Sequence, residues 1–370
     1  MAEAVYNLGL SGGLHCHAWS RDCSLLAVSH GEREATVFGR RGEGWQRLAE
    51  LDQHDLMVTS IDWAPVSNMI VTCSQDRNAY VWVEESGVWR HTLVLLRINR
   101  AATFVRWSPA ENKFAVGSGA RIISVCFYDK DNDWWVAKHI KRPLRSTITS
   151  LAWHPNNVLL AAGSTDYKVR VFSSYIKDIE AKPRPTVWGS KMPFAQLMSE
   201  FSNPGGGWVH SVAFSKDGQK LAWVSHDSSI AVAEPSVGLR RLITDCLPLV
   251  SLVWTSPVSL VSAGHDCLPL VFRLTQEGEI VLAYKLEDPQ PRQETGPAEG
   301  LAAMKMFRSR DRTGEVCEGD YKLGTTHQNQ ITEVRRLEVD GAEKELVSTT
   351  GLDGRLCVWR VTEREGGPAE

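Results

Sequence analysis

A segment that repeats about every 44 residues constrains the fold of this chain more than any other feature. Short apolar runs end in an aromatic residue at six places, which are Trp19, Trp63, Trp107, Trp153, Phe214 and Trp254. The first two intervals are both 44 residues long. Each run is followed by a turn and a second apolar run, which is the pattern of a series of short strands.

The spacing inside the repeat is also regular. From Trp63 to the turn residue Asp76 there are 13 residues, and two further units keep the same interval. From Asp76 to Trp82 there are 6 residues, as there are from Asp353 to Trp359. A seventh unit, ELVSTTGLD, completes the set. Four short strands per unit, with tryptophan at the end of the third, are typical of a WD40-type blade. The sequence therefore predicts an all-β fold, a seven-bladed WD40-type β-propeller that forms a single domain over residues 1–365.

Two of the units carry a polar set that gives the repeat a physical role. In WD repeats the aspartate holds a loop histidine, the histidine faces a threonine hydroxyl, and that hydroxyl accepts the indole N–H, so the buried donor is paired. The two sets are His54, Thr72, Asp76 and Trp82 in blade two, and His327, Thr349, Asp353 and Trp359 in blade seven. Because these residues recur as part of the blade, we expect them to be structural and not catalytic.

The two ends of the chain are expected to close the ring. An open propeller would expose an unpaired edge strand at each end. Residues 2–8 precede the first strand of blade one and can supply the outer strand of blade seven, beside residues 354–361. The last residues, 366–370, are then expected to form a disordered tail.

The repeat is interrupted between blades four and five by residues 173–207. This insertion is too rich in apolar residues for a flexible linker. Its apolar residues include Trp188, Met192, Phe194 and Leu197. Either they pack back onto the propeller, or some of them, Trp188 and Phe194 first, belong to a partner interface.

A second interruption covers residues 285–326, before blade seven. Within it, residues 298–310 have the pattern of a short helix. Its apolar residues are Leu301, Met304, Met306 and Phe307, and its basic residues include Lys305 and Arg308. Such a helix suggests docking on an acidic protein surface, and the alternative is a disordered spacer.

A smaller basic feature, KHIKRPLR, lies at the junction of blades three and four. Its cations are Lys138, Lys141, Arg142 and Arg145. These either form a solvated loop or contact an acidic neighbour.

Composition narrows the possible functions. A net charge of -3 gives no general attraction to nucleic acid or anionic lipid. No signal peptide and no run long enough to span a membrane is visible, so we expect a protein of the cytosol or nucleus. The eight cysteines lack a CxxC pair and are expected to be buried free thiols. We found no enzyme motif and expect no cofactor. His15, Cys16 and His17 suggest a metal site only weakly, because alternate residues of a strand face opposite ways.

Some stretches are more specific than the repeat. They include DRNAYVW (76–82), KHIKRPLRST (138–147), HPNNVLLAAGS (154–164) and WGSKMPF (188–194). In these stretches the chain closely resembles subunit 1 of the actin-related protein 2/3 complex, and the resemblance extends over nearly the whole length.

The resemblance implies a non-catalytic structural and regulatory subunit that supports actin filament nucleation and branching. Its partners would be the actin-related proteins, the small scaffold subunits, the actin filament and nucleation-promoting factors. It would work in the cytoplasm at the actin cytoskeleton, with the nucleus as a further location. The resemblance also implies that Leu301, Met304, Phe307 and Arg308 face the mother filament or an activating factor. The alternative is a generic WD-repeat adaptor, such as a substrate receptor or chromatin scaffold.

Overall fold

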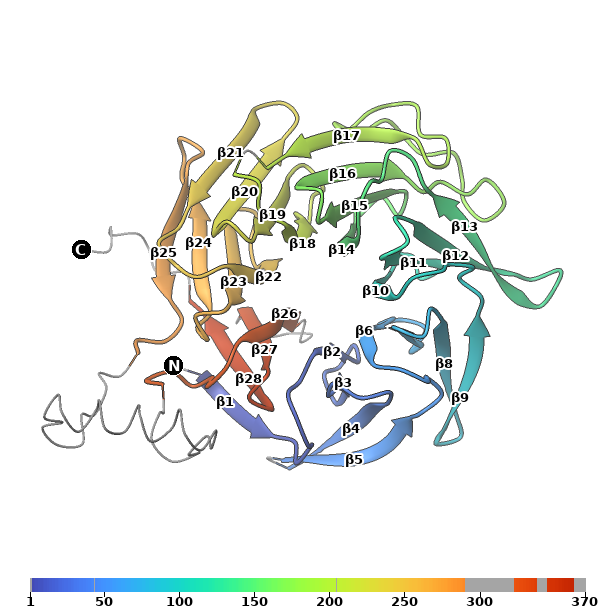
Figure 1. Cartoon of the computed structure of the whole chain (residues 1–370), viewed down its shortest axis with the longest axis horizontal. Helices are drawn as coiled ribbons and strands as arrows, with labels where there is room; N and C mark the ends of the chain where they lie inside the picture. Colours follow the sequence, from blue (N-terminus) through green and yellow to red (C-terminus); the bar gives the residue numbers. More distant parts are fainter. Residues whose placement is uncertain (1, 43, 204, 290–322, 338–344, 363–370) are drawn as a thin grey trace, which may run out of the picture.

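Four antiparallel strands make up each of seven sheets, and the sheets stand as blades around a central axis (Figure 1). This computed structural model describes residues 2–42, 44–203, 205–289, 323–337 and 345–362. The regular secondary structure within these ranges consists of β-strands alone. The predicted seven-bladed propeller is therefore confirmed.

The strands of each blade follow one another along the chain, from the channel outward, in blades one to six. Blades one to three consist of β2 (Cys16–Trp19), β3 (Leu25–Ser29), β4 (Ala35–Arg41), β5 (Gly44–Leu51), β6 (Val58–Trp63), β7 (Ile70–Ser74), β8 (Ala79–Glu85), β9 (Val88–Val94), β10 (Ala102–Trp107), β11 (Lys113–Ser118), β12 (Ile123–Asp129) and β13 (Trp134–Ile140). Blades four to six consist of β14 (Ile148–Trp153), β15 (Leu159–Ser164), β16 (Lys168–Ser173), β17 (Leu197–Ser202), β18 (Val209–Phe214), β19 (Leu221–Ser225), β20 (Ser229–Glu234), β21 (Gly238–Ile243), β22 (Leu249–Trp254), β23 (Ser259–Gly264), β24 (Leu270–Leu274) and β25 (Ile280–Lys285).

Blade seven combines the two ends of the chain. Its inner strands are β26 (Ile331–Leu337), β27 (Glu345–Gly351) and β28 (Arg355–Val361), and its outer strand is β1 (Ala2–Asn7). Strand β1 pairs antiparallel with β28, with Val5 opposite Cys357 (Figure 1, blue beside red). The expected closure by the N-terminal strand is therefore present, and it removes the two edges that an open ring would expose.

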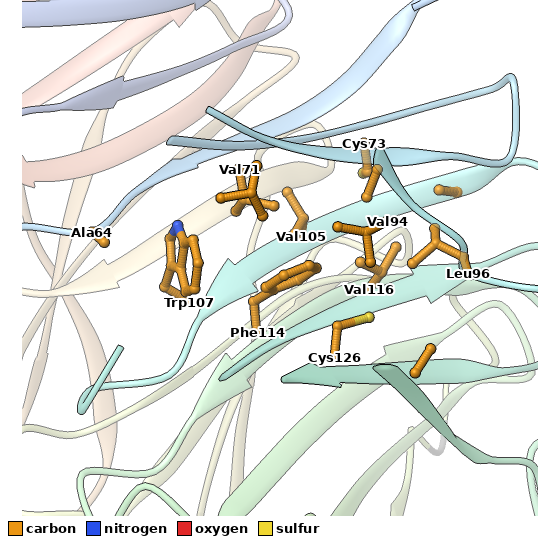
Figure 2. Packing of buried hydrophobic residues seen from close by; sticks show 14 residues of the cluster. Ala64, Val71, Cys73, Val94, Leu96, Val105, Trp107, Phe114, Val116 and Cys126 are labelled. Atoms are coloured by element: carbon orange, nitrogen blue, oxygen red, sulfur yellow. The ribbon is translucent and has the colours of Figure 1, made fainter. Parts of the chain in front are cut away.

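The apolar core lies between neighbouring blades. Figure 2 shows the contact of blades two and three, where Val71 and Cys73 of β7 face Val105, Phe114 and Val116 of blade three. All five side chains are fully buried. Because strand residues alternate between the two faces of a sheet, each blade contributes one apolar face to each neighbour. This arrangement makes the ring one continuous packed body.

Threonines fasten each inner strand to the next blade. The residue pairing of the two inner strands shifts at the same place in six blades, for example between Val58 and Ser60. In four blades a threonine fills the shifted position, and its hydroxyl donates to a carbonyl of the following blade. The four bonds run from Thr59 to Ala102, from Thr103 to Ile148, from Thr149 to Val209 and from Thr332 to Leu14. This contact explains why the apolar run so often has threonine second.

The interval 173–207 differs from the expectation. It contains β17, the outer strand of blade four, which pairs with β16. The extra residues, 174–196, therefore lie within blade four and not between blades four and five. The prediction missed β17 because none of its residues is fully buried and its sequence, LMSEFS, lacks the apolar run ending in an aromatic residue that marks the inner strands.

Two further expectations fall outside the described residues. The predicted helix at 298–310 is one, and the tail at 366–370 is the other. Of the seven cysteines in the described ranges, five are buried and all seven are free thiols. Cys23 and Cys246 are partly exposed, so the expectation of burial holds for most of them but not all.

Candidate partner-binding site

The structure brings both polar sets together as hydrogen-bonded chains. In blade two, His54 Nδ1 lies 2.8 Å from Asp76 and His54 Nε2 lies 2.8 Å from Thr72 Oγ1, which accepts the Trp82 indole N–H at 2.9 Å. Blade seven repeats the arrangement. There, His327 Nε2 lies 2.7 Å from Thr349 Oγ1, the Trp359 indole donates to the same oxygen at 2.8 Å, and Asp353 holds His327 Nδ1 at 3.1 Å.

Replacing Thr349 by valine tests this chain. The substitution keeps the shape but removes the shared partner of His327 Nε2 and the Trp359 indole, both fully buried. We expect the free energy of unfolding to fall by about 2 kcal/mol in urea titrations, since a buried polar group without a partner costs about 1–3 kcal/mol. Thr92→Val on the exposed face of β9 is the control, with a change within about 0.5 kcal/mol. Equal effects of the two variants would contradict a role for the hydroxyl.

A second polar cluster joins blades across the central channel. Glu333 Oε1 on β26 accepts from Arg106 on β10 at 2.8 Å and from Arg335 at 3.0 Å. Arg335 also donates to Asp62 on β6 at 2.8 Å. The other oxygen of Glu333 accepts the backbone N–H of His17 at 2.8 Å. The carboxylate of Glu333 thus joins blades one, three and seven, and Arg335 extends the cluster to Asp62 of blade two.

The charges of this cluster hold one another ionised. Burial alone would raise the pKa of Glu333, but Arg335, the hydrogen bond from His17 and Arg106 together hold it well below its usual range. Burial lowers the pKa of His17, so its ring is neutral at pH 7. Both ring nitrogens of His17 lie within hydrogen-bond distance of hydroxyls, Thr350 at 3.1 Å and Ser348 at 2.8 Å.

The contacts of His17 and the burial of Cys16 bear on the weak suggestion of a metal site at this strand. Both nitrogens of His17 already have partners in blade seven, and Cys16 is buried in the core between blades one and two, where burial raises its pKa, so these two residues of β2 belong to the contacts between blades. Within the described ranges, no group of three or more His, Cys, Asp or Glu side chains is arranged to hold a metal ion. The same residues contain no helix long and apolar enough to cross a membrane.

The cluster suited to a partner is on the surface, at one end of blade three. Because the strands of a blade alternate in direction, the loop before β10, the loop between β11 and β12 and the loop after β13 meet at one end. The Gly119 N–H donates to the Ala101 carbonyl at 2.9 Å, which joins the first two loops. All the charged residues of the three loops are basic and exposed, namely Arg97, Arg100, Arg121, Lys141, Arg142 and Arg145. We call these six residues the basic surface.

The basic surface surrounds a hollow of about 740 Å³. Arg100, Arg121 and Thr147 line it, one from each loop. The loops are held from below, where Arg97 donates to the Ala137 carbonyl at 2.7 Å and His139 contacts the Leu96 carbonyl at 2.8 Å. A fixed set of cations with no acid among them attracts an acidic segment of a protein.

The structure places the sequence-predicted basic residues in two groups. Lys141, Arg142 and Arg145 belong to the basic surface, whereas Lys138 lies on β13 and pairs with Asp178 at 3.2 Å. Sequence reasoning missed Arg97, Arg100 and Arg121, because the loops that carry them are far apart in the repeat. The available signal was that each of these loops contains arginine and no acid.

The apolar residues of the inserted segment are divided in the same way. Trp188 is 3% exposed, and its indole donates to the Gly218 carbonyl at 2.7 Å. Trp188 and Met192 therefore belong to the core between blades four and five. Of the two alternatives for Trp188, the structure shows packing onto the propeller, and the candidate partner contact at Trp188 is not supported. Phe194 is half-buried against the core of blades three and four. Leu301, Met304, Phe307 and Arg308 lie outside the described residues.

Comparison with known proteins agrees with the propeller geometry. The family described as "WD domain, G-beta repeat" matches residues 45–83 and 138–173. The chain is 51% identical to actin-related protein 2/3 complex subunit 1A-A of Xenopus laevis, over 94% of this chain and 93% of the relative. It is 44% identical to subunit 1 of Schizosaccharomyces pombe, over 93% of this chain and 95% of the relative. Identity to subunit 1B of Arabidopsis thaliana is 37%, over 93% of each chain.

Proposed function

The chain belongs to the family of actin-related protein 2/3 complex subunit 1, and from this membership we propose that it is a structural and regulatory subunit of that complex. The observation that carries the proposal is the 51% identity over 94% of the chain. In this role the propeller supports the nucleation and branching of actin filaments and performs no catalysis. It contacts the actin-related proteins and the small scaffold subunits, in the cytoplasm and at the actin cytoskeleton, and a nuclear pool is also part of the proposal.

The build of the propeller supports a scaffold role. An apolar cluster packs each blade against its neighbour, and the polar cluster around Glu333 and Arg335 joins four of the blades at the channel. A closed ring of this kind changes shape little when it binds, so it presents surfaces at fixed positions. The basic surface is such a position. Within the complex we assign it to an acidic segment of a neighbouring subunit or of a nucleation-promoting factor.

Charge reversal tests the basic surface. In the variant Arg100→Glu, Arg121→Glu, Arg145→Glu, we expect affinity for an acidic peptide from a nucleation-promoting factor to fall at least tenfold at low salt, because attraction becomes repulsion. The difference should shrink as salt is added. Fluorescence titration with the labelled peptide measures it. Arg40→Glu with Arg41→Glu, on the exposed end of β4, is the matched control. If both variants bind equally well, this surface is not the site.

Residues 298–310 are proposed as the contact with the mother filament or an activating factor, through Leu301, Met304, Phe307 and Arg308. Phe307→Asp places a charge among the apolar residues and should reduce branching several-fold while the complex still assembles. Mass spectrometry of the purified complex measures assembly, and branch counting by microscopy measures the second effect. If the Phe307→Asp variant branched filaments as well as the wild type does, the proposed contact of residues 298–310 with the filament would be wrong. Recovery of the wild-type chain with ubiquitin-ligase or chromatin components instead of actin-related proteins would contradict the proposed function.

A further inference from the structure

Blade three has a second surface of opposite charge, at the end that faces away from the basic surface. A groove of about 1060 Å³ runs there between blade two and blade three. Strand β8 supplies one wall, and strands β12 and β13 supply the other (Figure 1). The loop between β10 and β11 and the hairpin between β12 and β13 lie at this end. We call the feature the blade two–three groove.

The floor of the groove is apolar and held in place. Val81 and Val83 come from β8, and Phe127, Trp135 and Val136 come from blade three. The Trp135 ring packs against the rings of Phe114 at 5.1 Å, Tyr128 at 5.6 Å and Trp107 at 5.9 Å. Phe114 and Trp107 belong to the buried core between the two blades (Figure 2). The floor is therefore formed before any partner arrives, which lowers the ordering cost of binding.

The rim of the groove is acidic. Its lining contains four carboxylates, Glu111, Asp129, Asp131 and Asp178, and one cation, Lys130. Hydrogen bonds from Asn132 and the backbone lower the pKa of Asp129, so it is charged at pH 7. Asp131 is exposed, and the side chain of Asp178 is 67% exposed. Asp178 pairs with Lys138 at 3.2 Å across the solvent-exposed edge of the groove, whereas no hydrogen bond or ion pair engages the side chain of Asp131 among the described residues. Asp131 is therefore the carboxylate most accessible to a bound cation.

Large apolar side chains are also exposed in and beside the groove. Val83 and Tyr128 are each 37% exposed, and Trp134, in the adjoining hairpin, is 55% exposed. Aromatic residues of this kind are enriched among those that contribute most to protein interfaces. An apolar floor with a carboxylate rim is complementary to a segment that has one apolar face and flanking lysines or arginines.

We propose that the blade two–three groove binds a positively charged amphipathic segment of another subunit of the complex. The apolar face of that segment lies on Val83, Tyr128 and Trp135, and its cations face Asp131 and Asp178. The inference rests on the proposed function for the source of the segment. The groove and the basic surface then bind partners of opposite charge at the two ends of one blade.

The first experiment needs no other subunit. The full chain is titrated with a synthetic amphipathic helix of about 15 residues built from leucine and lysine, and with the same peptide carrying glutamate in place of lysine. We expect the lysine peptide to bind more tightly. Asp131→Lys with Asp178→Lys should weaken it at least tenfold, and the matched control Glu277→Lys in blade six should leave it unchanged. Equal binding to the groove variant and the control would overturn the groove as a site.

The second experiment uses the assembled complex. Val83→Arg fills the groove with a charged side chain, and Val237→Arg, at an exposed turn of blade five, is its control. We expect only Val83→Arg to reduce the yield of complete complex, by about tenfold. Complete assembly of this variant would overturn the assignment to a partner subunit. If the wild-type chain entered no complex while the peptide result held, the proposed function would fail and the groove would remain.

Discussion

Replacement of Glu333 by glutamine is expected to lower the free energy of unfolding by about 3–5 kcal/mol, the usual cost of breaking a buried ion pair. The side chain of Glu333 is 7% exposed, and its carboxylate serves Arg106, Arg335 and the backbone of His17. Without its charge, two largely buried guanidinium groups share Asp62 alone. Urea unfolding of the purified chain measures the change.

A surface pair provides the control for this variant. Glu85 pairs with Arg90 at 2.7 Å, and both side chains are more than half exposed. Solvent screens such a pair, so Glu85→Gln should change the free energy of unfolding by no more than about 0.5 kcal/mol. A similar small change for Glu333→Gln would show that the channel cluster does not hold the blades together.

The same variant should change the response to acid. The pKa of Glu333 is held below its value in the unfolded chain, so its contribution is complete above that unfolded value, about 4.3. It is lost progressively as the pH falls below that value. The stability difference between wild type and Glu333→Gln should therefore shrink below about pH 4.5 and stay constant above it. A constant difference down to pH 3 would contradict this assignment.

Replacement of Lys113 by methionine is expected to have a similarly large effect, about 3–5 kcal/mol. Lys113 lies on β11 and is fully buried, with its ammonium 2.5 Å from Glu180 and 3.0 Å from the Ser174 carbonyl. Burial lowers the pKa of Lys113, and Glu180 opposes that shift. Methionine would leave the carboxylate of Glu180 buried without its cation.

A double-mutant cycle makes the second prediction specific. Glu180→Gln alone would leave the ammonium of Lys113 buried without a counter-charge, whereas the double variant removes both charges together. We expect the double variant to be more stable than the sum of the single effects implies, by about 1–3 kcal/mol. Additive effects in urea titrations would mean that the two side chains act independently. The cycle also tests whether this pair fastens residues 174–196 to blade three.

The propeller could be predicted because its signals repeat along the chain. The aromatic residue and turn acid recur at fixed intervals, and the polar sets at His54 and His327 lie within one repeat each. The channel cluster has no such signal. Arg106 and Glu333 are 227 residues apart, and only the closed ring brings them together. Buried Lys113 was missed for the same reason, since its partner Glu180 lies in the next blade.

The candidate sites differ in the same way: features within one stretch of sequence could be predicted, and features assembled from several repeats could not. KHIKRPLR was visible because its four cations fall within eight residues of sequence, whereas the arginines that complete the basic surface come from loops of separate strands. The blade two–three groove could not be predicted, because its walls belong to different repeats. The sequence left open whether Trp188 packs onto the propeller or contacts a partner, because an irregular segment has no periodic pattern that shows which way a side chain faces.

The pairing of β1 with β28 also has a consequence for how the cell makes this protein. Of the strands of the propeller, β1 is synthesised first and β28 last, so β1 has no partner until the other blades have been made. A pairing between such distant segments is slow, since the entropy of joining them is lost before their contacts form. Each nascent chain therefore carries an unpaired β-edge until β28 has left the ribosome. During that interval the chain is most exposed to aggregation and most dependent on chaperones.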